Sequence, residues 1–198
     1  MRPCYGFNMN QVLPTLMTVD EFLRWSVRQE QGRYELEGGR VVAMPAESYG
    51  HVKAKSRIEK ALNAAIARSG LPYIAITDGM SVPIGAHRAY EPDALVLPLP
   101  EPSDDALSIT NPVIVLEVLS QTPSSVRRDL TTKVAGYALV PSIQHYIVID
   151  AAERLVLHYK RHGSVLVAPD EPTDGMLRLD PPGLEVPVIE LLGPEPAA

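Results

Sequence analysis

The sequence predicts an α/β fold in which a mixed sheet is combined with helices. Three observations predict it. Segments with the 3.6-residue period of amphipathic helices alternate with short runs rich in β-branched residues. The stretch from His51 to Ser69 contains neither Gly nor Pro, which favours one long helix. The stretch from Val113 to Leu119 is apolar at both alternating sets of positions except at Glu117, which is typical of a central strand covered on both faces.

The chain before the long helix predicts a short helix and a hairpin. Thr18 and Glu21 form a capping-box pattern, so we expect a helix to begin there. The runs Tyr34–Leu36 and Arg40–Met44 flank Gly38-Gly39, and glycines accept the positive φ of a hairpin turn. Two antiparallel strands should therefore follow the first helix.

The long helix should end at Gly70, and Ser124 or Ser125 should cap a later helix that ends before Pro141. Apolar runs bounded by turn residues give the strands. The expected strands are 73–77, 80–84, 94–97, 113–119, 145–149 and 155–159, and the Pro-rich tail holds an edge strand or packed extension at 186–192.

The length of 198 residues fits one domain, which we expect at residues 18–198 after an N-terminal extension at 1–17. The 18 Lys and Arg against 24 Asp and Glu give a net charge of -6, so any contact with nucleic acid must be local. The single cysteine, Cys4, excludes an intramolecular disulfide and a cysteine-based zinc cluster within the chain. Without a signal-peptide core or membrane-length apolar run, we expect a cytoplasmic protein with no membrane association.

Glu117 is the first candidate for chemistry. A carboxylate in a buried strand must be protonated, paired, hydrogen-bonded or bound to a cation. The alternatives to a metal are an exposed strand end or an ion pair with a helix cation. Asp93 supplies a second carboxylate, because Pro92-Asp93 stands just before another buried strand, although such a pair also occurs in ordinary turns.

Lys133 shares a helical face with Asp129 and Tyr137, because each lies four residues away. An ordinary surface ion pair between Asp129 and Lys133 would explain that spacing equally well.

The combined pattern resembles the PD-(D/E)XK nuclease superfamily, and within it the Uma-type endonucleases. The landmarks, between about Met17 and His162, are Tyr34-Glu35-Leu36, Gly39, His51, Pro92-Asp93, Glu117-Val118-Leu119-Ser120, Arg128-Asp129, Lys133 and Tyr137. The sequence departs from the superfamily motif at Leu119, where a lysine normally stands, and the Uma-type pattern moves that lysine to the next helix, here Lys133. It also lacks the usual glycine before Pro141, which affects only the local turn.

The resemblance implies a restriction endonuclease-like core, with a central, mainly four-stranded mixed sheet flanked by helices and decorated with extra hairpins. It also implies metal-dependent hydrolysis of phosphodiester bonds, with Asp93 and Glu117 as ligands of Mg²⁺ or Mn²⁺ and Lys133 orienting the attacking water. Glu35 would complete the metal shell, unless it lies on a solvated strand face. His51 and Asp129 would be accessory residues, and a histidine at a helix start can also be merely structural.

The expected partner is nucleic acid, most simply DNA, bound by a homodimer. Lys53, Lys55, Arg57 and Lys60 on the long helix, with Arg127 and Arg128, would give local basic surface, although scattered solvated charge is the alternative. Two rival functions remain open. The fold could serve binding or assembly without cleavage. A glycoside hydrolase with two carboxylates would need aromatic platforms, which Trp25 and two phenylalanines hardly provide.

Overall fold

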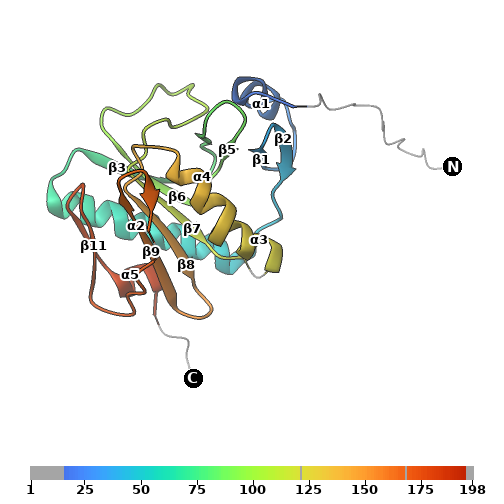
Figure 1. Ribbon diagram of the computed structural model, residues 1–198. Coiled ribbons are helices and arrows are strands. Elements are labelled where there is room, and N and C mark those ends of the chain that lie inside the picture. Colours follow the sequence, from blue (N-terminus) through green and yellow to red (C-terminus); the bar gives the residue numbers. More distant parts are fainter. Residues whose placement is uncertain (1–15, 121, 168, 195–198) are drawn as a thin grey trace.

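The protein is described by a computed structural model, which places residues 16–120, 122–167 and 169–194. A six-stranded mixed sheet lies at its centre (Figure 1). The strand order is β10-β9-β8-β7-β6-β3, and only the β7–β8 pair is parallel. The strands are β3 (Tyr73–Thr77), β6 (Ala94–Pro98), β7 (Ile114–Val118), β8 (His145–Asp150), β9 (Leu155–His162) and β10 (Val165–Leu166). The expected mixed sheet is confirmed, with six strands rather than four.

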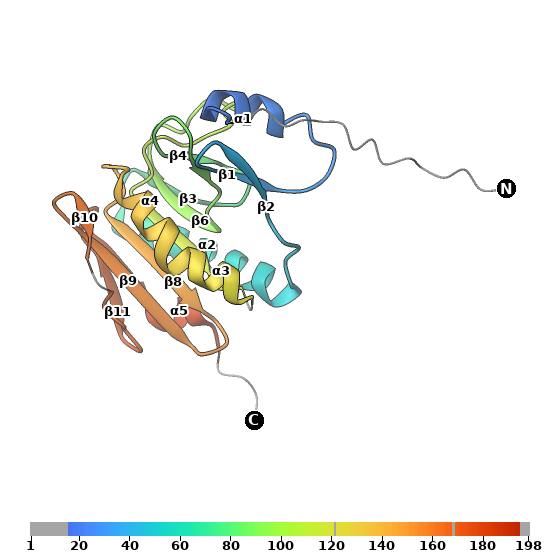
Figure 2. The ribbon, with the colours of Figure 1, turned by 45° about the vertical axis from the view of Figure 1, so that its right-hand side comes forward.

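Helices cover both faces of this sheet (Figure 2). Helix α2 (Tyr49–Ser69) packs on one face, where Ile58 and Leu62 meet the strands. The helical segment from Pro123 to Ala138 packs on the other face, where Tyr137 lies against Tyr146 of β8. Because both faces of β7 are covered, its five residues are all buried, as its apolar pattern predicts.

Helix α2 confirms the predicted long helix and begins two residues earlier than expected. Its N-cap is Ser48, whose hydroxyl accepts a hydrogen bond from the amide of His51. It ends at Gly70, which has the left-handed φ of 64° that glycine adopts without strain. The capping residues therefore fix His51 in the first turn of α2.

The helix after β7 is not uniform. It comprises α3 (Pro123–Arg127), the π-helical segment η1 (Arg128–Lys133) and α4 (Val134–Ala138). The expected serine caps are wrong, because the N-cap is Thr122 and Pro123 occupies the first turn, where its missing N–H costs nothing. The π-helical turn, which the sequence does not predict, carries both Asp129 and Lys133.

A second, four-stranded sheet lies beside the first, in the order β2-β1-β5-β4. It contains the predicted hairpin, and α1 carries the predicted capping box between Thr18 and Glu21. Its own small core joins α1 to β1 through Phe22 and Leu36. The elements are α1 (Val19–Ser26), β1 (Tyr34–Glu37), β2 (Arg40–Ala43), β4 (Val82–Pro83) and β5 (Ala89–Tyr90).

The C-terminal tail was expected to form an edge strand or a packed extension, and it forms a packed extension. Strands β11 (Met176–Leu179) and β12 (Leu184–Pro187) form a hairpin, and α5 (Val188–Leu192) follows. Their apolar side chains join the core on the α2 side of the central sheet. The extension therefore packs beside α2.

The sequence-based boundaries need several corrections. The expected strand 80–84 is reduced to β4, and 188–192 is helical rather than extended. Neither β5 nor β10 is predicted, because a two-residue strand leaves no period to detect. The predicted extension at 1–17 lies mostly outside the described residues, although Met17 is buried against α1. Among the described helices, none combines the length and apolarity that crossing a bilayer requires.

Candidate active site

Asp93 and Glu117 face each other across two neighbouring strands. Strands β6 and β7 are antiparallel with Ala94 opposite Leu116, and continuing that register by one residue places Asp93 opposite Glu117. The Asp93 Oδ2 atom accepts a hydrogen bond of 2.7 Å from the amide of Val118, which fixes the carboxylate at this edge of the sheet. The two carboxylates that the sequence pairs are therefore adjacent.

Glu117 is buried, with 3% of its surface exposed, so it does not lie at a solvated strand end. Its Oε1 atom accepts hydrogen bonds from Lys133 Nζ at 2.7 Å and from the Tyr137 hydroxyl at 3.1 Å. Burial raises the pKa of Glu117, Lys133 opposes that rise, and the nearby carboxylates of Asp129, Asp93 and Glu35 add to it. The Oε2 atom has no hydrogen-bond partner among the described residues, and it remains available to a ligand.

Lys133 is a buried cation surrounded by three carboxylates. Besides Glu117, its ammonium lies 3.1 Å from Glu35 and 3.6 Å from Asp129. Burial alone would lower the pKa of Lys133, but the three carboxylates outweigh it and raise the pKa. Lys133 is therefore protonated at neutral pH. It does not form a simple surface ion pair with Asp129, because it is buried and also contacts Glu35 and Glu117.

Glu35 reaches the same cluster from the second sheet. It is completely buried, so the alternative of a solvated strand face is wrong. One of its oxygens accepts a 2.9 Å hydrogen bond from the amide of Glu91 and contacts Lys133, and the other pairs with Arg128. Both oxygens are thus already engaged by protein groups.

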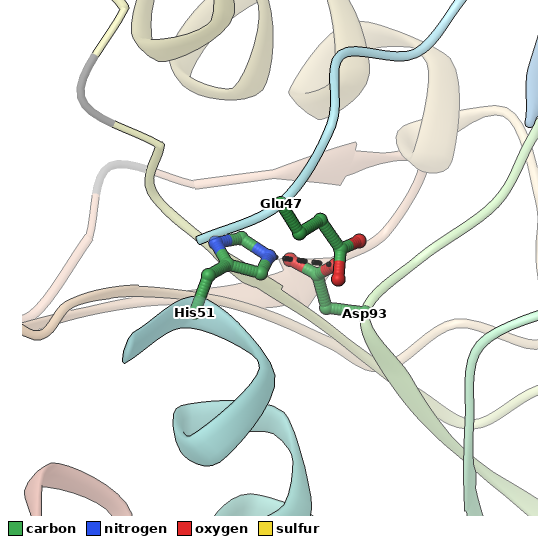
Figure 3. Close-up of side chains that lie close together, drawn as sticks. All are labelled: Glu47, His51 and Asp93. Atoms are coloured by element: carbon green, nitrogen blue, oxygen red, sulfur yellow. Dashed lines mark hydrogen bonds and ion pairs between the residues drawn. The ribbon is translucent and has the colours of Figure 1, made fainter. Parts of the chain in front are cut away.

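Asp93 also lies close to Glu47 and His51, and the three residues together offer atoms that could bind a metal ion (Figure 3). His51 Nε2 is 3.2 Å from Asp93 Oδ1, and a carboxylate oxygen of Glu47 lies within 4.8 Å of both. Burial raises the pKa of Asp93, but hydrogen bonds from His51 and Val118 and the charge of Lys133 outweigh it, so the pKa is lowered. Asp93 is therefore ionised and presents one oxygen toward His51.

Lys55 fills the inner side of this group. Its ammonium pairs with Glu47 and lies 2.7 Å from Asp78 and 3.8 Å from Asp93. With 2% of its surface exposed, Lys55 belongs to this buried network and not to the basic surface expected for the helix. Arg128 is likewise engaged by Glu35 and lies over the ring of Tyr90.

The donor set fits a divalent cation. Glu35, Asp93, Glu117 and Asp129 are buried together, and among the described residues the lysine and arginine side chains paired with them are Lys133, Arg128 and Lys55. Lys55 is shared with Glu47 and Asp78, so the four carboxylates still outnumber the positive charges that face them. An excess of buried negative charge is costly unless a cation offsets it. Carboxylate oxygens with one imidazole nitrogen suit Mg²⁺ or Mn²⁺.

The structure brings all the residues named from the sequence into one region. Asp93, Glu117, Lys133, Glu35, His51 and Asp129 each contact at least one other member of this set. Sequence reasoning missed Glu47 and the buried role of Lys55. A signal was present for Lys55, which stands one turn after His51 on the same face of α2, whereas Glu47 stands in the loop before the Ser48 cap, where no period applies.

The comparisons with known proteins agree with this architecture. Residues 19–188 match the model of the Uma2 family, described as "Putative restriction endonuclease". An uncharacterized protein of Synechocystis is 27% identical over 153 residues, which span 75% of this chain and 82% of that protein. A crystal structure from Anabaena variabilis, described as a "putative nuclease", matches 89% of this chain and 97% of its own with a TM-score of 0.66 and 18% identity, so it supports the fold alone. The Uma2 family model covers residues 19–188, which is most of this chain. The chain therefore belongs to the Uma2 family of nuclease-like proteins.

Proposed function

We propose that the protein is a metal-dependent endonuclease that hydrolyses phosphodiester bonds in DNA. One observation carries the proposal: Asp93 and Glu117 are held side by side at a sheet edge, with the buried ammonium of Lys133 2.7 Å from Glu117. Membership of a family described as restriction endonucleases supports the reaction class.

Asp93 and Glu117 would hold Mg²⁺ or Mn²⁺, with His51 and Glu47 available on the far side of Asp93. When bound, the metal lowers the pKa of a coordinated water and offsets charge that develops on the phosphate. The Val118 amide keeps Asp93 in position, and burial excludes competing bulk water from Glu117.

Lys133 would donate to a non-bridging phosphate oxygen or orient the attacking water, because its charge is permanent at neutral pH. Asp129 and Tyr137 hold Lys133 and Glu117 in place. We assign Glu35 to positioning rather than to metal binding, since Arg128, Lys133 and the Glu91 amide already engage its two oxygens.

DNA is proposed as the substrate because the family is described as "Putative restriction endonuclease", and restriction endonucleases act on DNA. Cleaving both strands of a duplex needs two sites, so we propose that a homodimer is the working unit.

The test is cleavage of supercoiled, linear and single-stranded DNA and of RNA, in Mg²⁺ or Mn²⁺ and in chelator. The variants Asp93→Asn, Glu117→Gln and Lys133→Met should each lose at least about a hundredfold in rate. Glu101→Gln, which removes an exposed charge from a loop, should cleave like the wild type.

Metal binding gives a readout that does not depend on activity. Titration of Mn²⁺ followed by electron paramagnetic resonance should show one site per chain, weakened in Asp93→Asn. No cleavage of any substrate, or cleavage unaffected by the three substitutions, would refute the nuclease assignment. Metal binding without cleavage would instead favour a binding or assembly role for this fold.

A further inference from the structure

A groove of about 710 Å³ lies between α2, the β8–β9 turn and the end of the C-terminal extension. Four of its lining residues are cationic and, among the described residues that line it, none is acidic. These are Lys53, Arg57 and Lys60 from α2 and Arg154 from the turn. We call the groove lined by these four cations the basic groove.

Among the described residues, no carboxylate pairs with the four charges of the basic groove. None of them forms an ion pair with a described residue, and what distinguishes them from other unpaired cations of the chain is that all four line one groove. Arg57 and Arg154 lie close enough for the charge of Arg154 to lower the pKa of Arg57, after the larger effect of burial. Like charges held together without a counterion indicate a surface that receives an anion.

Two of the cations are fixed in place by the chain. Arg57 Nε donates a 2.9 Å hydrogen bond to the carbonyl of Leu191. Arg154 donates to the carbonyls of Gly193 and Pro194, both at 3.1 Å. The C-terminal extension thus holds both guanidinium groups in position, which reduces the entropy lost when a ligand binds.

One end of the basic groove, lined by Gly50, Ala151 and Arg154, lies at the same edge of the central sheet as the candidate active site. Strand β7 presents Glu117 near its carboxyl end, and the parallel pairing of Val118 with Ile149 puts the end of β8 at that edge. The turn after β8 carries Arg154. Neighbouring strands are about 4.8 Å apart, so β9 lies about 10 Å from β7, roughly three base-pair rises of a duplex.

From this geometry we infer that the basic groove binds the sugar–phosphate backbone of duplex DNA and leads the strand to the sheet edge that holds Asp93 and Glu117. The identity of the polymer rests on the proposed function, whereas the charge and the position of the groove do not. The groove supplies local attraction that a chain of net charge -6 otherwise lacks.

The test is equilibrium binding of a fluorescent DNA duplex, measured by anisotropy in chelator over a series of salt concentrations. The variant Lys53→Gln/Lys60→Gln changes only exposed side chains. Its affinity should fall by at least about tenfold near 0.1 M salt, and the slope of log K against log salt should fall by about 1.8, or 0.9 for each lost phosphate contact. Arg154→Gln should lower the slope by about 0.9.

The matched control is Arg40→Gln/Lys160→Gln, which removes the same charge from exposed positions on the β1–β2 hairpin and on β9 opposite His145. Its binding should equal that of the wild type. Equal affinity in the groove and control variants, no binding of DNA by the wild type, or binding of an RNA duplex in place of DNA would overturn the inference.

The two proposals fail separately. If no protein cleaves DNA but the groove variant still loses binding, the nuclease assignment fails and the groove stands. If cleavage depends on Asp93 and Lys133 while the groove and control variants bind alike, the groove fails and the nuclease assignment stands.

Discussion

Lys133 is buried between three carboxylates, so its charge contributes to stability and, on the proposed function, to catalysis. Removing one partner of a buried ionic group leaves uncompensated charge, which typically costs about 3–5 kcal/mol. We therefore expect Lys133→Met to lower the free energy of unfolding by about that amount, as well as to abolish cleavage. Urea denaturation measures the loss, and Lys160→Met, an exposed change, should show almost none.

The cost of Lys133→Met should depend on pH. The pKa of Glu117 is raised in the folded protein, so the folded state binds its proton more tightly than the unfolded state does. The free energy of unfolding therefore increases as the pH falls toward 4.5, the pKa of Glu117 in the unfolded chain. The increase should be larger in Lys133→Met, because Lys133 no longer opposes the rise of the Glu117 pKa. The stability gap between variant and wild type should narrow as the pH falls from neutral toward 4.5. A gap that stays constant would contradict this account of the site.

His51 distinguishes the possible metals. Its Nε2 atom lies 3.2 Å from Asp93, and an imidazole nitrogen contributes more to binding of Mn²⁺ than of Mg²⁺. His51→Ala should therefore weaken Mn²⁺ binding by roughly 10- to 100-fold and leave Mg²⁺ binding less affected. Calorimetric titration of both ions measures the difference, with His162→Ala, on an exposed residue, as the control. An equal loss for the two ions would contradict the expected preference for Mn²⁺, and no loss for either ion would place His51 outside the ligand set.

At the scale of elements, α4 lies against β5 through a glycine. A Cβ atom built on Gly136 would be 2.6 Å from the ring of Tyr90, which in turn stacks under Arg128. Gly136→Ala should therefore cost about 1–3 kcal/mol in spite of the better helix propensity of alanine. Thermal unfolding measures the change.

The matched control for this prediction is Gly50→Ala in the first turn of α2, where the nearest atom is an ordinary 3.8 Å away. It should leave stability unchanged or raise it by up to about 1 kcal/mol. If the two alanines behave alike, helix α4 does not depend on this close approach.

The elements also show what the sequence could and could not predict. Capping residues and hydrophobic period located α1, α2 and the β8–β9 hairpin, because these signals are local. The π-helical turn has no such local signal, and its residue Lys133 pairs with carboxylates on other elements, which lie far away in the sequence. Asp93 and Glu117 could be paired from sequence because each interrupts or adjoins an apolar strand. Glu47 could not, since an exposed loop before a helix gives no sign of what it approaches.

At the scale of the whole molecule, two buried histidines join the C-terminal extension to the central sheet. His145 donates through Nε2 to the carbonyl of Pro181 at 2.8 Å, so its Nδ1 accepts from His158 Nε2, also at 2.8 Å. Burial, followed by the neighbouring His158, lowers the pKa of His145 to about 4. Lys160 also lowers it, and Asp180 opposes these effects.

This arrangement predicts acid sensitivity. A histidine whose folded pKa is depressed contributes its full stability above the unfolded value near 6.5, and that stability is lost as the pH falls toward 4. The free energy of unfolding should therefore decline in this range by up to about 1.4 kcal/mol per pH unit for each proton taken up. His145→Asn should remove part of the slope, and the exposed His162→Asn should not. Equal slopes in all three proteins would contradict the prediction.

Glu35 belongs to the smaller sheet, whereas the residues that it contacts, Lys133 and Arg128, belong to the helix on the larger one. The site is therefore completed only when two separately built parts of the chain have come together. In a partly folded molecule that lacks the N-terminal hairpin, Glu35 would be missing from beside Lys133 and Arg128. On the proposed function, cleavage would then be restricted to fully folded molecules, and quality control of folding would also protect the DNA of the cell.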